Sequence, residues 1–111
     1  MNDLKIGRPV RVVSICFRDK ELEEIAAIVD REGAKGADLI CLPETWRGQT
    51  DDTQETLEGP TITAMAALAK KHRTYLICPM DRKDGDKRFN SGVLIDREGK
   101  VACVYDKVYP F

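Results

Sequence analysis

Two charged residues directly follow apolar runs, at positions where the ligand-binding side chains of α/β proteins gather. Glu44 follows residues 39–43, and Lys107 follows residues 101–106. The ligand crevice of an open α/β sheet lies beyond the carboxyl ends of its strands, so this carboxylate and this ammonium are the first candidates for a functional site. Each of them, taken alone, also fits a residue that only marks where a strand meets water. The site hypothesis therefore requires the two side chains to converge on one pocket.

The cysteines and the single histidine offer a second kind of chemistry. A thiol paired with His72 would form a nucleophilic dyad, but this histidine lies at the basic end of a predicted helix and is expected to face solvent. The cysteines are scattered singly through apolar runs, without the close spacing of zinc sites and redox motifs. They are Cys16, Cys41, Cys78 and Cys103. We expect buried, reduced thiols, and we predict neither a metal site nor a cofactor.

A polar stretch at residues 45–59 follows Glu44 and is predicted to form a long irregular loop. Trp46 lies near the start of this loop. Its indole has two interpretations that the sequence leaves open. It either lines a substrate pocket or anchors the loop to the core.

Hydrophobic periodicity places two helices and five strands around these residues. Apolar side chains recur at helical spacing from Leu22 to Val29, behind an N-cap at Asp19, and from residue 62 to 69 behind Pro60. The predicted strands are nearly continuous apolar runs, as in sheets covered on both faces. They cover residues 10–17, 37–42, 75–80, 89–96 and 101–106, with turns at 81–88 and 97–100. The order predicts an α/β fold, a mixed sheet with two helices on one face.

The length, composition and net charge of the chain fit one globular domain over residues 1–111 and argue against several classes of partner. Hydrophobic residues make up 42% and charged residues 33% of the chain, and 18 basic and 19 acidic side chains leave a formal net charge of −1. That balance provides no field to gather nucleic acid or an anionic membrane. Charges also interrupt the first twenty positions, so no signal peptide or membrane span is predicted, and a cytoplasmic location is the default expectation.

Three segments together resemble the nitrilase superfamily of carbon–nitrogen hydrolases. They are Ala-Asp-Leu-Ile-Cys-Leu-Pro-Glu at 37–44, Asn-Ser-Gly-Val-Leu-Ile at 90–95 and Tyr-Asp-Lys at 105–107. The resemblance implies the first half of a four-layer α-β-β-α sandwich and hydrolysis of an amide, N-carbamoyl or nitrile carbon through a Glu-Lys-Cys triad. Glu44 would be the general base and Lys107 the stabiliser of the oxyanion. Asn90 matches a family asparagine, for which a backbone-tying role is expected.

The same resemblance implies that one catalytic group is not in this chain. The family's nucleophilic cysteine lies well downstream of the lysine motif, and no such segment occurs up to Phe111. We therefore expect a partial domain, inactive by itself, from a longer hydrolase that acts on a small-molecule amide or nitrile. Its doubly apolar strands need a second layer, so self-association into a homo-oligomer is expected. The alternative is a non-catalytic α/β binding or interaction module derived from this fold.

Overall fold

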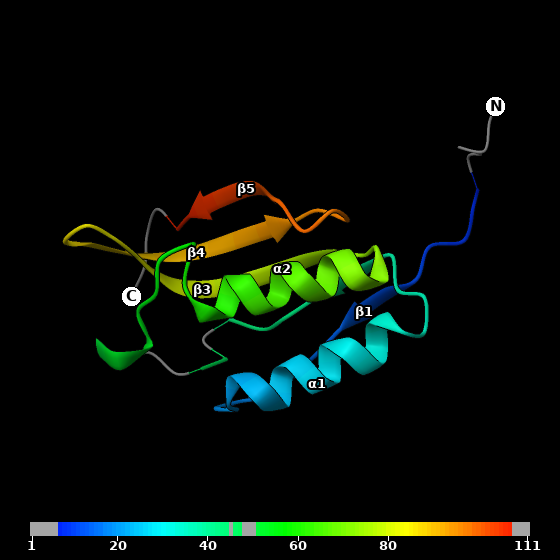
Figure 1. Cartoon of the computed structure of the whole chain (residues 1–111), viewed down its shortest axis with the longest axis horizontal. Helices are drawn as coiled ribbons and strands as arrows, with labels where there is room; N and C mark the ends of the chain where they lie inside the picture. Colours follow the sequence, from blue (N-terminus) through cyan, green and yellow to red (C-terminus); the bar gives the residue numbers. More distant parts are fainter. Residues whose placement is uncertain (1–6, 45, 48–50, 108–111) are drawn as a thin grey trace.

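The computed structural model describes residues 7–44, 46–47 and 51–107, which form a five-stranded mixed sheet (Figure 1). The spatial order is β1-β2-β3-β4-β5; the first three strands are parallel, and β4 and β5 are added as antiparallel hairpins. The strands are β1 (Val12–Ser14), β2 (Leu39–Cys41), β3 (Tyr75–Asp84), β4 (Lys87–Ile95) and β5 (Val101–Asp106). The predicted mixed sheet is confirmed.

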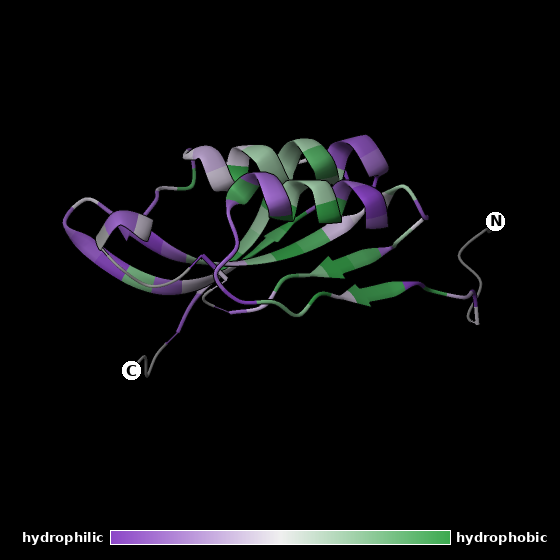
Figure 2. Ribbon diagram, turned by 90° about the horizontal axis from the view of Figure 1, so that it is seen from below, coloured by the Kyte–Doolittle hydropathy of each residue, from purple (hydrophilic) through white to green (hydrophobic). Residues whose placement is uncertain are grey.

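Two helices cover one face of this sheet, as predicted (Figure 2). They are α1 (Leu22–Gly33) and α2 (Pro60–His72), and a short 3-10 helix, η1 (Asp51–Thr53), precedes α2. The predicted N-cap at Asp19 is wrong, because α1 begins after Glu21, which forms a reciprocal capping box with Glu24. Asp19 adopts a left-handed φ of 53° in the turn before the helix. Pro60 occupies the first turn of α2 as predicted, since a missing N–H costs nothing there.

The core lies between the helices and the sheet. Its fully buried members come from alternate strand positions and from one face of each helix, as the two periodicities require. The largest are Ile25, Val29, Ile40, Met65, Leu76, Val93 and Ile95. His72 extends this packed face of α2, so the prediction that it faces solvent is wrong. Its side chain is only 11% exposed, and its Nε2 lies 2.6 Å from Asp30 Oδ1 on α1.

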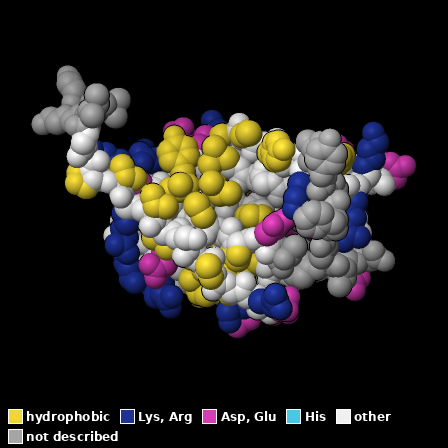
Figure 3. Space-filling view, turned by 180° about the vertical axis from the view of Figure 1, so that it is seen from behind, with side chains coloured by type: hydrophobic (Ala, Val, Ile, Leu, Met, Phe, Trp, Pro, Cys, Tyr) yellow, Lys and Arg dark blue, Asp and Glu magenta, His cyan; other side chains and the backbone are white. Residues whose placement is uncertain are grey.

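The opposite face of the sheet is apolar and open. Figure 3 shows hydrophobic side chains gathered across it. Exposed members include Val12 on β1, Tyr75 on β3 and Tyr105 on β5. The first strand was predicted at residues 10–17 and is only three residues long, because few backbone groups pair there beyond the register of β2. Among the described residues no helix covers this face, so every strand is covered on one side only.

Candidate active site

Glu44 and Lys107 meet on the open face of the sheet, 63 positions apart in the chain. Lys107 Nζ donates to Glu44 Oε1 over 3.1 Å, and Asn90 Nδ2 donates to the same oxygen over 3.0 Å. The two predicted residues and the asparagine are thus brought together in one cluster. The glutamate and lysine side chains are 54% and 35% exposed, so a ligand on this face reaches both.

Strand direction explains why the two residues meet. β2 and β3 are parallel, and β5 is parallel to them as well because two antiparallel pairings, β3 with β4 and β4 with β5, separate it from β3. The carboxyl ends of β2 and β5 therefore lie at the same end of the sheet. Lys107 stands one residue beyond β5 and continues its ladder, because its N–H donates to Asn90 O over 2.8 Å. Three strand spacings of about 4.8 Å still separate β2 from β5, so the chain after β2 must cross the end of β3.

The crossing segment takes over the hydrogen bonds that β2 would have made with β3. Three successive carbonyls on that side of β3 each find a different donor. Ile77 O accepts the Leu42 N–H at 3.0 Å, Pro79 O accepts the Trp46 indole N–H at 2.9 Å, and Asp81 O accepts the Glu55 N–H at 3.0 Å. A proline is tolerated in the middle of β3 because its missing N–H points to the side that β2 has left.

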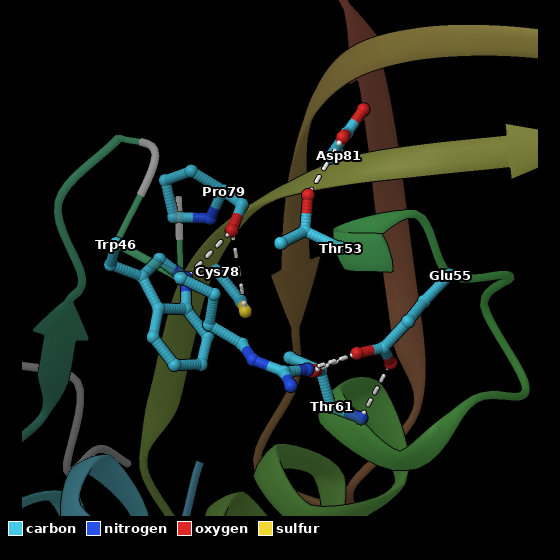
Figure 4. A network of polar contacts seen from close by, with 8 residues as sticks. Trp46, Thr53, Glu55, Thr61, Cys78, Pro79 and Asp81 are labelled. Atoms are coloured by element: carbon cyan, nitrogen blue, oxygen red, sulfur yellow. Dashed lines mark hydrogen bonds and ion pairs between the residues drawn. The ribbon is translucent and has the colours of Figure 1, made fainter. Parts of the chain in front are cut away.

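Trp46 is the main apolar anchor of this crossing (Figure 4). It is only 2% exposed, and its ring packs edge-on against Phe17 with centroids 5.9 Å apart. The burial and the bond to Pro79 O favour the interpretation that it anchors the loop. A substrate contact for Trp46 stays a prediction. Pro79 itself lies between the indole and the open face, where it borders the cluster around Glu44.

A polar network holds the far end of the loop, and none of its contacts was predicted from the sequence. Arg47 Nη1 pairs with Glu55 Oε2 and donates to Thr61 Oγ1 at 2.9 Å. Glu55 accepts the Thr61 N–H at 2.8 Å and the Thr61 hydroxyl at 2.7 Å, so its carboxylate caps the positive end of α2 (Figure 4). A sequence signal existed, namely a glutamate shortly before a Pro-initiated helix. The pairing with Arg47 depends on loop geometry that spacing does not give.

The cluster is electrostatically biased toward an ionised carboxylate. Hydrogen bonds from Lys107 and then from Asn90, with the nearby ammonium charge, hold the pKa of Glu44 below its ordinary value of 4.5. Desolvation, which acts in the opposite direction, is the smallest contribution because the side chain is exposed. At neutral pH Glu44 is therefore a charged acceptor aimed at an ammonium.

An open hollow of about 340 Å³ surrounds the pair. Its walls are mostly apolar or backbone, with one acidic and one basic side chain. The lining residues are Glu44, Pro79, Asn90, Ser91, Gly92, Tyr105 and Lys107. A hollow of this size accepts a small molecule. The opposite charges of Glu44 and Lys107 are suited to orienting and polarising a polar bond of such a molecule.

None of the four cysteines lines this hollow. Cys78 is fully buried, and burial followed by the charge of Glu55 raises the pKa of its thiol to about 12. Cys103 is exposed on β5, but four residues of strand place it about 13 Å from Lys107. The prediction of buried thiols holds for Cys78, whereas Cys16 and Cys103 are exposed because they lie outside the helix-covered face. All four are free, and no group of metal-ligating side chains occurs within the described ranges.

The fold and this cluster define an α/β protein with a glutamate–lysine site at one end of a mixed sheet. The sequence model of one family, carbon-nitrogen hydrolase, matches residues 16–111. The chain therefore belongs to the carbon–nitrogen hydrolase family, as its resemblance to the nitrilase superfamily predicted.

Similar proteins are considerably longer. A formamidase from Bacillus cereus is 29% identical over 118 aligned positions, which cover 96% of this chain and 36% of the formamidase. A nitrilase and fragile histidine triad fusion protein from Drosophila melanogaster is 29% identical over 97 positions, 81% of this chain and 21% of the fusion protein. Among solved structures, an N-terminal amidase bound to an Asn-Glu-Ala peptide superimposes with a TM-score of 0.77 at 16% identity, over 92% of this chain and 29% of the amidase. The chain spans about a fifth to a third of these proteins. The structural match confirms the nitrilase-type fold.

Proposed function

We propose that Glu44 and Lys107 are two members of a catalytic triad that hydrolyses non-peptide carbon–nitrogen bonds, with the nucleophilic thiol supplied from outside residues 1–111. The observation that carries the proposal is the 3.1 Å contact between Lys107 Nζ and Glu44 Oε1 beside an open hollow. An acid and an amine at the ends of two non-adjacent strands have no structural need to meet there.

Each residue has the chemistry its role requires. Glu44, ionised at neutral pH, accepts the thiol proton as general base and later activates water. Lys107 directs a compact three-donor ammonium at the oxygen that becomes negative in the tetrahedral intermediate. Asn90 fixes the glutamate by its side-chain amide and the lysine by its carbonyl, which keeps both groups aimed at one reacting atom. A layer over the open face would raise the pKa of Glu44 and make it a stronger base.

A small uncharged amide is the substrate class that we favour, with N-carbamoyl compounds and nitriles as the related alternatives. The lysine and glutamate charges of the hollow balance each other, so the described part of the site offers no net attraction to an ionic substrate. The similarity to a formamidase supports the preference for amides.

The test is ammonia release from formamide, larger amides and a nitrile by the protein encoded by the complete reading frame. Glu44→Gln and Lys107→Met should each lower kcat/KM by about 10²–10⁴, the range for losing a general base or an oxyanion donor. Turnover within tenfold of the parent in either variant would overturn the assignment. The 111-residue chain alone should release no ammonia. Release from it that Glu44→Gln abolishes would show that the nucleophile lies within these residues.

We also propose that the apolar open face is covered by protein, in homo-oligomers or by further layers of the same domain. The support is the set of exposed hydrophobic side chains across that face (Figure 3). Light scattering of the 111-residue chain at increasing concentration should show a species heavier than 12.5 kDa. A monomer at all concentrations would contradict self-association. No described helix is long and apolar enough to cross a membrane. The cytoplasmic location stays a prediction.

A further inference from the structure

A ring of three polar side chains ties together β3, β4 and β5 next to the candidate active site. Arg82 Nη2 on β3 lies 3.0 and 2.9 Å from the two carboxylate oxygens of Asp106, the last residue of β5. Ser91 on β4 completes the ring. It accepts a hydrogen bond from Arg82 Nε at 3.2 Å and donates its hydroxyl proton to Asp106 Oδ1 at 2.6 Å.

The side chains of this ring lie on the helix side of the sheet, whereas the hollow opens on the other face and is bordered by one of the three residues, Ser91. Side chains alternate along a strand, so Asp106 points away from the face to which Tyr105 and Lys107 contribute. Ser91 is 2% exposed and lies on the same face of β4 as the buried Val93, two residues further on. The hydrogen bonds of the ring join its own three members and not Glu44 or Lys107, although Asp106 is the direct neighbour of Lys107.

The end of β5 needs such a tie because β5 is an edge strand. Within the part of the chain that the structure describes, it pairs only with β4, and a register shift already interrupts that pairing between Leu94 and Ile95. A slip of one residue would turn every side chain of the strand to the opposite face and move Lys107 away from Glu44. The pairing of Ser91 with Asp106 is the last register position before Lys107.

We propose that the ring of Arg82, Ser91 and Asp106 is a positioning device that fixes the end of β5 and thereby the face on which Lys107 meets Glu44. The inference rests on the proposed function in that it assigns the ring a purpose in catalysis. The pKa of Asp106 is lowered by its hydrogen bonds from Ser91 and then from Arg82, so the ring stays charged at neutral pH. The fork of Arg82 also stacks over Phe89 at 4.7 Å, which restricts the guanidinium to one plane.

The test uses Asp106→Asn in the 111-residue chain, with two readouts at the site. The backbone amide of Lys107, bonded to Asn90 O, should exchange its hydrogen at least tenfold faster, while the amide of Val93 changes less than threefold. The pKa of Glu44, followed by carboxyl-carbon NMR, should rise toward 4.5. Uniform acceleration of both amides, or an unchanged pKa, would overturn the positioning role.

A matched control is present on the same hairpin. Asp81 also takes an arginine fork, from Arg88 at 2.8 and 2.6 Å, and a hydroxyl, from Thr53 at 3.1 Å, but these bonds tie it to β4 and η1 and not to β5. Asp81→Asn should therefore leave the exchange ratio between the Lys107 and Val93 amides unchanged, and a tenfold change would count against the proposal.

A milder variant keeps the proposal testable where Asp106→Asn fails to fold. Ser91→Ala removes one side of the ring and leaves the arginine pair, so it should give a smaller increase of the same selective kind. If Ser91→Ala accelerated exchange at the Lys107 and Val93 amides by the same factor, that result would overturn the inference as well. These readouts do not involve turnover, so the positioning role and the proposed hydrolysis can fail separately.

Discussion

Replacing Glu55 by glutamine should destabilise the protein by about 2–4 kcal/mol. The carboxylate is only 12% exposed and accepts hydrogen bonds from Arg47 and from both donors of Thr61. A hydrogen bond to a charged group is worth about 1.5–3 kcal/mol, and glutamine retains one oxygen for the helix N–H. What is lost is the charge opposite Arg47 and part of the interaction with the helix dipole. The expected loss in the free energy of unfolding therefore corresponds to one or two hydrogen bonds to a charged group.

The assay is urea unfolding followed by the fluorescence of Trp46, the single and fully buried tryptophan. With a slope of about 1.5 kcal/mol per M, the midpoint should fall by about 1.3–2.7 M. Glu58→Gln is the matched control, because Glu58 precedes the same helix but is exposed, and it should cost less than about 1 kcal/mol. Equal midpoints for the two variants would refute the idea that the hydrogen-bonded carboxylate of Glu55 anchors this loop.

Three further predictions concern packing, reactivity and pH. Gly33→Ala should cost about 1–3 kcal/mol, because a Cβ there would lie 2.5 Å from the His72 ring, and urea unfolding measures it. Cys16 should react with a thiol reagent at pH 8 in the native protein, whereas Cys78, with its pKa raised by burial to about 12, should react only after unfolding. Asp38 has its pKa lowered, first by a backbone N–H and then by arginine partners, so its contribution to stability is complete above pH 3.8 and is lost as pH falls through the lower folded value. Asp38→Asn should make the acid loss of stability shallower in unfolding curves recorded between pH 5 and pH 2.

The sequence predicted the elements well because their signals are local. The helix beginning at Pro60 and the strand at 101–106 have the predicted bounds, since proline and the following turn residues mark them directly. The strand predicted at 10–17 is shorter, because apolar composition cannot tell how many backbone groups find a partner. The hairpin turn predicted at 81–88 is only two residues long, with Gly85 at φ 63°. Cross-strand pairing continues over polar residues on both sides of the turn, and such residues are predicted as loop from their low hydropathy.

The meeting of Glu44 and Lys107 was predictable from the sequence, but the contacts that support it were not. Glu44 and Lys107 were predicted to meet because both follow apolar strands, and the carboxyl ends of parallel strands lie at the same end of a sheet. The ring at Asp106 was not found, since its members are 9 to 24 positions apart and show no periodicity. His72 was misplaced for a related reason. A basic helix end suggests solvent, but its contact with Asp30 on the other helix depends on how the helices pack.

The fold positions the ion pair between Glu44 and Lys107, but the pair contributes little to the stability of the fold. Exposed pairs of this kind stabilise a protein by about 0–1 kcal/mol, whereas ordering one backbone residue costs about 1–2 kcal/mol. The pair therefore cannot compensate for ordering the segment that crosses the end of β3. That cost is met by Trp46 in the core and by the partly buried carboxylate of Glu55. A fold whose buried anchors bring two weakly interacting charges to one hollow has the arrangement expected when the charges serve a bound molecule.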